Sequence, residues 1–172
     1  MAKQENERKI ATKNYVALAV LGIFTIFVTL YICKWINIYK EEKLMTSPLT
    51  EVVSEIYLSE LSESILETDE AIIYFGYTND KDNYELEEKI LKEIKNKGLN
   101  EYVFYVNVKD YLENKEYEKM IKDIFPELEN KNLKAPLLVY TKRATPIKIK
   151  SSNKKLITVK DFNNLANILE TE

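Results

Sequence analysis

An uncharged, mostly apolar run of 20 residues, from Asn14 to Cys33, constrains this chain more than any other feature. As a helix with a rise of about 1.5 Å per residue, the run is roughly 30 Å long, which matches the hydrocarbon core of a bilayer. Aromatic side chains stand near both ends, where a membrane interface favours them. The alternative, a buried helix of a soluble domain, fits less well because so long an uncharged run is rare there. We therefore predict a transmembrane helix over residues 14–36, anchored by Tyr15, Gly22, Phe24, Phe27, Tyr31 and Trp35.

The flanks of this run indicate how it is inserted. The polar tail, residues 1–13, carries four Lys or Arg residues, and the opposite flank, up to Lys43, carries three. Positive charge is retained in the cytoplasm, so this difference favours a cytoplasmic N-terminus and an extracytoplasmic C-terminal domain. The run is too long for the apolar part of a cleaved signal peptide, and no small-x-small site follows it. We expect a single-pass signal-anchor in the cell membrane, with the lipid bilayer as a partner.

The composition excludes several classes of function. The chain has no histidine and one cysteine, Cys33, which excludes zinc sites, haem ligation by histidine, Ser–His or Cys–His catalysis and intrachain disulfides. Its three glycines cannot form a glycine-rich phosphate loop. A net charge of −3 is unlike the basic surface of a nucleic-acid-binding protein. We expect no metal, no cofactor and no nucleic-acid partner.

After a connector over residues 37–51, apolar patterns typical of strands alternate with patterns typical of helices. This alternation predicts an α/β domain over residues 52–172, with a central mixed sheet and helices on both faces. The sheet begins with parallel strands and ends in an antiparallel hairpin. The predicted strands are Ile56–Leu58, Ala71–Phe75, Tyr102–Val108, Leu137–Tyr140 and a half-exposed edge strand through Ile147 and Ile149. The predicted helices are Ser59–Leu66 (or a longer helix, Leu49–Leu66), Tyr84–Lys97, one through Tyr117 and Ile124, and Val159–Leu169.

The helix Tyr84–Lys97 follows a strand and a polar loop, which is where a functional group is often placed. Its apolar residues recur every four positions, from Leu86 onward. Asp82 or Asn83 is expected to cap its first turn, and Gly98 to end it.

The position of one proline in this order of elements indicates a more specific fold. Ala135-Pro136 directly precedes the strand Leu137–Tyr140, and the strand Ala71–Phe75 runs through Gly76-Tyr77 into the polar loop. This layout resembles the thioredoxin-like superfamily over about residues 52–170. In that family a cis-proline faces the loop that carries a CxxC motif. More narrowly, the chain resembles the membrane-anchored thioredoxin-like bacteriocin accessory proteins of Gram-positive bacteria, through Ile56-Tyr57-Leu58, Tyr74-Phe75-Gly76 and Phe104-Tyr105-Val106-Asn107-Val108.

The chain departs from the family at its reactive centre. The CxxC motif would fall within Asn79–Asn83, which contains no sulfur, and thiol–disulfide exchange requires a thiolate. Asp80 and Asp82 suit the positive end of a helix dipole, so we interpret them as capping residues rather than catalytic ones. Pro136 either shapes an edge on which an extended peptide docks, as the resemblance implies, or only fixes the turn into the strand. The expected binding residues are Thr78, Asn79, Asp80, Asp82, Ala135 and Pro136, and no catalytic residue is expected.

These inferences lead to three hypotheses of function. The favoured one is a membrane-anchored, redox-inactive thioredoxin-like module that is not an enzyme and acts as a binding, chaperone or accessory protein on exported peptides or membrane partners. The alternative is a structural subunit of a larger secretion or transport complex in the membrane. The minor alternative is a relative of the thiol–disulfide oxidoreductases that uses Cys33 or the thiols of a partner.

Overall fold

The computed structural model describes residues 12–114, 116–153 and 155–169, and it divides into two units, residues 1–43 and 44–172. The described part of the first unit lies in the helix α1 (Thr12–Leu44), whose last residue belongs to the second unit and which is long and apolar enough to cross a membrane. The predicted anchor residues all lie on α1 with exposed side chains. Most of the polar tail predicted over residues 1–13 lies outside the described residues.

The second unit is built on a sheet of five strands in the order β1-β3-β2-β4-β5. The strands β1, β3 and β2 are parallel, while β4 pairs antiparallel with both β2 and β5. This arrangement confirms the predicted mixed sheet, parallel at first and closed by an antiparallel hairpin. The strands span Ser54–Glu55 (β1), Glu70–Gly76 (β2), Val103–Asn107 (β3), Leu137–Lys142 (β4) and Thr145–Ser151 (β5).

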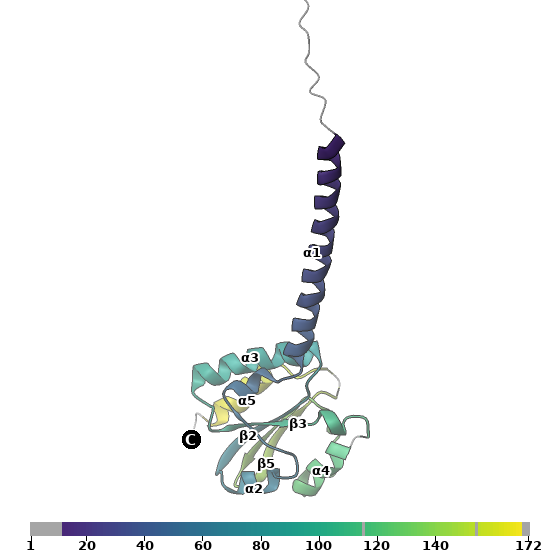
Figure 1. Cartoon of the computed structure of the whole chain (residues 1–172). Coiled ribbons are helices and arrows are strands. Elements are labelled where there is room, and N and C mark those ends of the chain that lie inside the picture. The colour runs from purple at the N-terminus through teal and green to yellow at the C-terminus, as the bar shows by residue number, and fades with distance from the viewer. Residues whose placement is uncertain (1–11, 115, 154, 170–172) are drawn as a thin grey trace, which may run out of the picture. The chain divides into compact units, whose positions relative to one another are not determined.

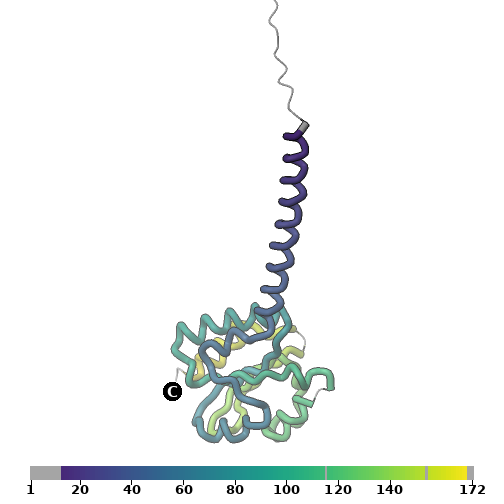
Figure 2. The backbone as a smooth tube through the Cα atoms, in the orientation of Figure 1, coloured from purple at the N-terminus to yellow at the C-terminus, as the bar shows by residue number. Residues whose placement is uncertain are grey.

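Helices cover both faces of this sheet (Figure 1). One face is covered by α3, α5 and the short 3₁₀ turn η1, and the other by α2 and α4. The backbone trace shows α3 and α5 on the side of the sheet opposite to α4 (Figure 2). The predicted α/β fold class is therefore confirmed. The helices span Leu61–Leu66 (α2), Lys81–Lys97 (α3), Glu116–Ile124 (α4) and Val159–Leu169 (α5). The 3₁₀ turns are Pro48–Glu51 (η1), Lys109–Tyr111 (η2) and Pro126–Leu128 (η3).

The central strand β2 explains why two cores form. Successive side chains of a strand point to opposite faces, so Ile72 and Tyr74 enter the core under α3 and α5, while Ile73 and Phe75 enter the core under α2 and α4. All four are fully buried. A strand that is buried on both faces needs a continuous apolar run rather than an alternating one, and this is the pattern that the sequence shows.

The first strand differs from its prediction. The paired residues are Ser54 and Glu55 instead of Ile56–Leu58, and only the Ile56 N–H continues the pairing, to the Tyr105 carbonyl at 2.8 Å. A turn begins at Tyr57, whose carbonyl accepts a hydrogen bond from the Glu60 N–H, and this turn ends the strand. Ile56 and Leu58 are buried in the core beneath α2 and α4 instead, while Tyr57 is exposed. The longer alternative helix, Leu49–Leu66, does not form.

The segment after α1 is folded into the second unit. Ser47, Pro48 and Leu49 are buried, and Leu49 belongs to the core beneath α3. The Ser47 hydroxyl accepts a hydrogen bond from the Leu49 N–H and so caps η1. Residues that the sequence assigns to a connector therefore contribute to the packing of the domain.

Candidate functional site

The loop between β2 and α3 is ordered by the aspartate that caps α3. Asp80 has an extended backbone, and its Oδ1 accepts a hydrogen bond from the Asn83 N–H at 2.7 Å. The prediction that Asp82 or Asn83 would be the cap is wrong, because α3 begins three residues earlier than expected, at Lys81. Gly98 ends the helix in the left-handed conformation (φ 66°), as predicted.

The residue before the cap, Asn79, connects the loop to the start of the second unit. Its φ is 66°, a left-handed conformation that asparagine tolerates better than most residues. Its N–H donates a hydrogen bond of 2.7 Å to the carbonyl of Leu44, the last residue of α1 and the first of the second unit. The loop is therefore attached to the first residue of the second unit.

A buried asparagine supports the loop from below. The side chain of Asn83 is fully buried, and its Nδ2 donates hydrogen bonds to the Tyr77 carbonyl at 2.6 Å and to Glu87 Oε1 at 2.7 Å. Its Oδ1 accepts a hydrogen bond of 2.7 Å from the Tyr74 hydroxyl. One side chain thus fixes the loop, the strand β2 and the helix α3 relative to one another.

The carboxylate of Glu87 is the most unusual group in this network. Its side chain is 1% exposed, and its second oxygen, Oε2, accepts a hydrogen bond of 2.6 Å from the Ser47 hydroxyl. No Lys or Arg of the described residues forms an ion pair with it. Burial raises the pKa of Glu87 to about 7, although the hydrogen bonds from Ser47 and Asn83 act in the opposite direction.

The glycine at the end of β2 makes room for this carboxylate. A Cβ atom on Gly76 would lie 2.5 Å from Glu87 Oε1 and would also collide with the ring of Tyr74. Sequence reasoning considered Asn83 only as a cap and missed that Asn83 and Glu87 are buried and hydrogen-bonded to each other. Their spacing of four residues, in register with Leu91 and Ile94 on one face of the helix, was the available signal.

The second part of the site is the turn before β4. The peptide bond between Ala135 and Pro136 is cis, as the resemblance implies. The Ala135 N–H donates a hydrogen bond of 3.4 Å to the Tyr117 hydroxyl, which itself donates to the Leu133 carbonyl at 3.2 Å. No donor in the described part of the chain contacts the Ala135 carbonyl.

Two adjoining depressions join the loop to this turn, and we call them together the site groove. The first, of about 540 Å³, lies between the loop and the segment that contains η2, and the second, of about 570 Å³, extends to Ala135. They adjoin because Tyr77 and Leu112 line both. The first is also lined by Thr78, Asn79, Asp80, Lys109, Asp110 and Glu113, and the second by Tyr117, Glu118, Asn132, Lys134, Ala135 and Asn153.

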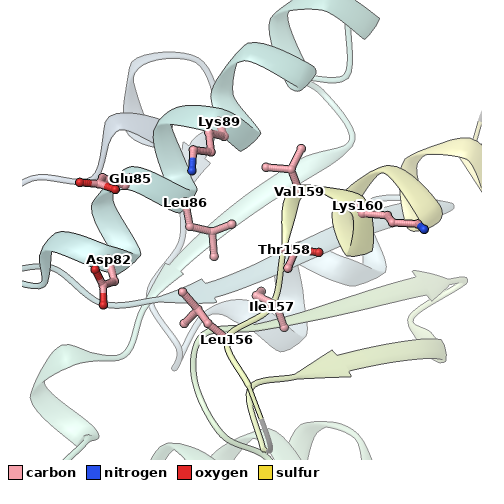
Figure 3. A pocket seen from close by; sticks show the side chains of 9 residues that line it. All are labelled: Asp82, Glu85, Leu86, Lys89, Leu156, Ile157, Thr158, Val159 and Lys160. Carbon is pink, nitrogen blue, oxygen red and sulfur yellow. The ribbon is translucent and has the colours of Figure 1, made fainter.

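The groove brings together four of the six predicted binding residues: Thr78, Asn79, Asp80 and Ala135. Pro136 is buried beside Ala135, and its carbonyl accepts a hydrogen bond of 2.7 Å from the Ser152 hydroxyl. Asp82 lies elsewhere. It lines a separate depression of about 460 Å³ between α3 and the segment Leu156–Lys160, where Leu86 and Ile157 face each other (Figure 3).

Comparison with known proteins identifies the fold. No protein-family model and no curated protein matches the chain. A solved structure described as a putative oxidoreductase with a thioredoxin fold matches 70% of this chain and 99% of its own, at 11% identity and a TM-score of 0.50. Thioredoxin f2 of Chlamydomonas reinhardtii matches 70% of this chain and 98% of its own (9% identity, TM-score 0.49). Mitochondrial thioredoxin 3 of Saccharomyces cerevisiae matches 72% and 99% (18% identity, TM-score 0.45).

Proposed function

We propose that this chain, whose second unit has a thioredoxin fold, is a membrane-anchored accessory protein that binds extended peptide segments in the site groove without thiol chemistry. The observation that carries the proposal is the groove itself, which runs from the loop at Tyr77 to Ala135, beside the cis-proline. The ligand would be an exported peptide or a segment of a membrane partner. The resemblance to bacteriocin accessory proteins of Gram-positive bacteria favours the exported peptide.

The residues around the groove are equipped to hold a ligand rather than to convert it. Its lining consists of tyrosines, carboxylates, lysines, amides and small or apolar side chains, without a thiol or an imidazole. The sequence has a single cysteine, Cys33, which lies in α1. The exchange reaction of the family needs a thiolate that attacks a disulfide, and nothing in the loop supplies one.

The backbone beside the proline can take part in binding from one side. An extended peptide presents N–H groups to carbonyl acceptors, and the Ala135 carbonyl is available to such a donor. The Ala135 N–H, in contrast, already donates to the Tyr117 hydroxyl. We therefore expect the peptide to form one backbone hydrogen bond with Ala135, instead of the two that a fully paired strand would form. Side-chain contacts supply the rest of the binding free energy.

Photo-crosslinking in native membranes tests the proposal. A photoreactive phenylalanine derivative at Lys134, which is exposed and lines the groove, is compared with the same group at Tyr57, which is 73% exposed and does not line it. We expect a crosslinked peptide or membrane protein at residue 134 that is absent at residue 57. Identical products at the two positions, or no product at either, would overturn the proposal.

The absence of redox activity is tested separately. The full chain in detergent micelles should not accelerate the reduction of insulin by dithiothreitol, and Cys33→Ser should leave every activity of the chain unchanged. Acceleration that Cys33→Ser abolishes would support the oxidoreductase alternative.

A second candidate function follows from α1. Its apolar side chains are exposed along the described helix, so they form a surface on which other transmembrane helices can pack. In that case the chain is a structural subunit of a secretion or transport complex, and the groove is unused. Stoichiometric partners that co-purify with the chain, and that variants of the groove do not release, would favour this function.

A further inference from the structure

The charges around the site groove indicate what kind of peptide it accepts. Four carboxylates line it, and they come from three different parts of the fold: Asp80 from the loop, Asp110 and Glu113 from η2 and the turn after it, and Glu118 from α4. Two lysines, Lys109 and Lys134, line it as well, so the described lining residues carry a net charge of −2.

Within the described part of the chain, these carboxylates are not neutralised by a cationic side chain. None of the four forms an ion pair with a Lys or Arg in the described ranges, and only Asp80 has a structural role, as the cap of α3. The hairpin of β4 and β5 shows the opposite situation, since Lys142 pairs with Glu70 at 2.8 Å and Lys150 with Asp161 at 3.4 Å. The negative potential of the groove is therefore available to a ligand.

The surface between these charges is partly apolar. Tyr77 and Leu112 line both depressions and are partly buried against the core beneath α4, while Tyr117 and Ala135 line the second depression. An extended peptide places successive side chains on opposite sides of its backbone, at a rise of about 3.3 Å per residue. Such a peptide presents one row of side chains to the apolar surface while the other row reaches the carboxylates.

We propose that the site groove selects an extended peptide in which apolar residues alternate with Lys or Arg. This inference rests on the proposed function and adds the chemical class of the ligand to it. The apolar contacts contribute to the affinity for any such peptide, and the carboxylates supply the discrimination by charge. Exposed ion pairs are individually weak, so removing two carboxylates should weaken binding of the cationic peptide by about 3- to 10-fold.

The test measures binding of three labelled peptides to the full chain in nanodiscs of zwitterionic phosphatidylcholine. The peptides share the same alternating valines and differ only in having Lys, Ser or Glu between them. Fluorescence anisotropy gives each Kd at low and high salt, and empty nanodiscs report any binding to lipid. We expect the order Lys, Ser, Glu from tightest to weakest, with differences that shrink at high salt because added ions screen the carboxylates.

Two double variants locate the effect. Asp110→Asn/Glu113→Gln should reduce the preference for the Lys peptide, whereas Asp82→Asn/Glu85→Gln, which removes two carboxylates from the separate depression, should not. Equal binding of all three peptides, with crosslinking from residue 134, would overturn the charge selection and leave the proposed function standing. Equal effects of the two double variants would likewise overturn the charge selection, since they would show that the preference depends on the net charge of the protein and not on the carboxylates of the groove. No binding of any peptide would contradict both proposals.

Discussion

Replacing Glu87 by Gln should make the domain more stable at pH 8 and leave it almost unchanged at pH 4. The side chain is 1% exposed, lacks a cationic partner among the described residues, and has its pKa raised from 4.5 to about 7 by burial. Between pH 4.5 and about pH 7, therefore, Glu87 keeps its proton in the folded chain but has lost it in the unfolded chain. Stability contributed by this group is complete below pH 4.5 and is lost as the pH rises to about 7.

The size of the effect follows from the shift in pKa. A rise from 4.5 to about 7 corresponds to about 3 kcal/mol at 1.36 kcal/mol per unit. Glutamine resembles the protonated acid in shape and remains uncharged at every pH. It can accept the hydrogen bond from Asn83 and donate one to the Ser47 hydroxyl. The difference in unfolding free energy between Glu87→Gln and the natural chain should rise from near zero at pH 4 to about 3 kcal/mol at pH 8.

The measurement is urea unfolding of the full chain in detergent micelles, followed by far-UV circular dichroism at several pH values. The free energy of the variant minus that of the natural chain isolates Glu87 from every other titrating group. Glu101→Gln, at an exposed position, is the matched control for replacing a carboxyl group by an amide. A difference for Glu87→Gln that stays constant from pH 4 to pH 8 would refute the assignment of Glu87 as a buried, uncompensated acid.

Three further predictions concern the same region. Ser47→Ala removes a donor to the Glu87 carboxylate, so it should raise the pKa of Glu87 further and destabilise the domain more at pH 8 than at pH 4, by about 1–3 kcal/mol in the same titration. Gly76→Ala places a Cβ atom 2.5 Å from Glu87 Oε1, and thermal unfolding should show a loss of about 1–3 kcal/mol or more. Asp80→Ala removes the cap of α3 and should cost about 1 kcal/mol in urea unfolding, whereas Asp82→Ala, which removes an aspartate that is not the cap, should cost less.

The sequence predicted the architecture well because the strands and helices carry strong periodic signals. The unbroken apolar run at Ala71–Phe75 predicted a strand covered on both faces, and β2 is such a strand. The four-residue spacing from Leu86 predicted α3, and Gly98 predicted its end. These signals are local, so they could be interpreted without knowing what packs against them.

The polar interior could not be predicted in the same way. Asn83 and Glu87 belong to residue types that usually lie on the surface of a helix. The Ser47–Leu49 segment packs against α3 and encloses Glu87 together with Asn83 and the end of β2 at Gly76. That segment is short and has no periodicity of its own. Its burial depends on contacts across the domain that the sequence pattern does not contain.

The sequence predicted only part of the candidate site, and the reason is related. Asp80, Asp82 and Asn83 are all residue types that cap helices, so composition alone does not select among them. The structure selects Asp80 because Asn83 turns inward to Tyr74 and Glu87. Since α3 begins at Lys81, Asp82 lies in its first turn and lines the other depression.

The central claim is that the thioredoxin fold of this chain binds an extended peptide in the groove between Tyr77 and Ala135. Amide chemical shifts of the full chain in small bicelles, recorded with and without the valine–lysine peptide, test it directly. We predict shifts at Tyr77–Asp80, Leu112 and Ala135, and none at Leu156–Lys160. Shifts confined to Leu156–Lys160, or the absence of any shift at a saturating peptide concentration, would contradict the account.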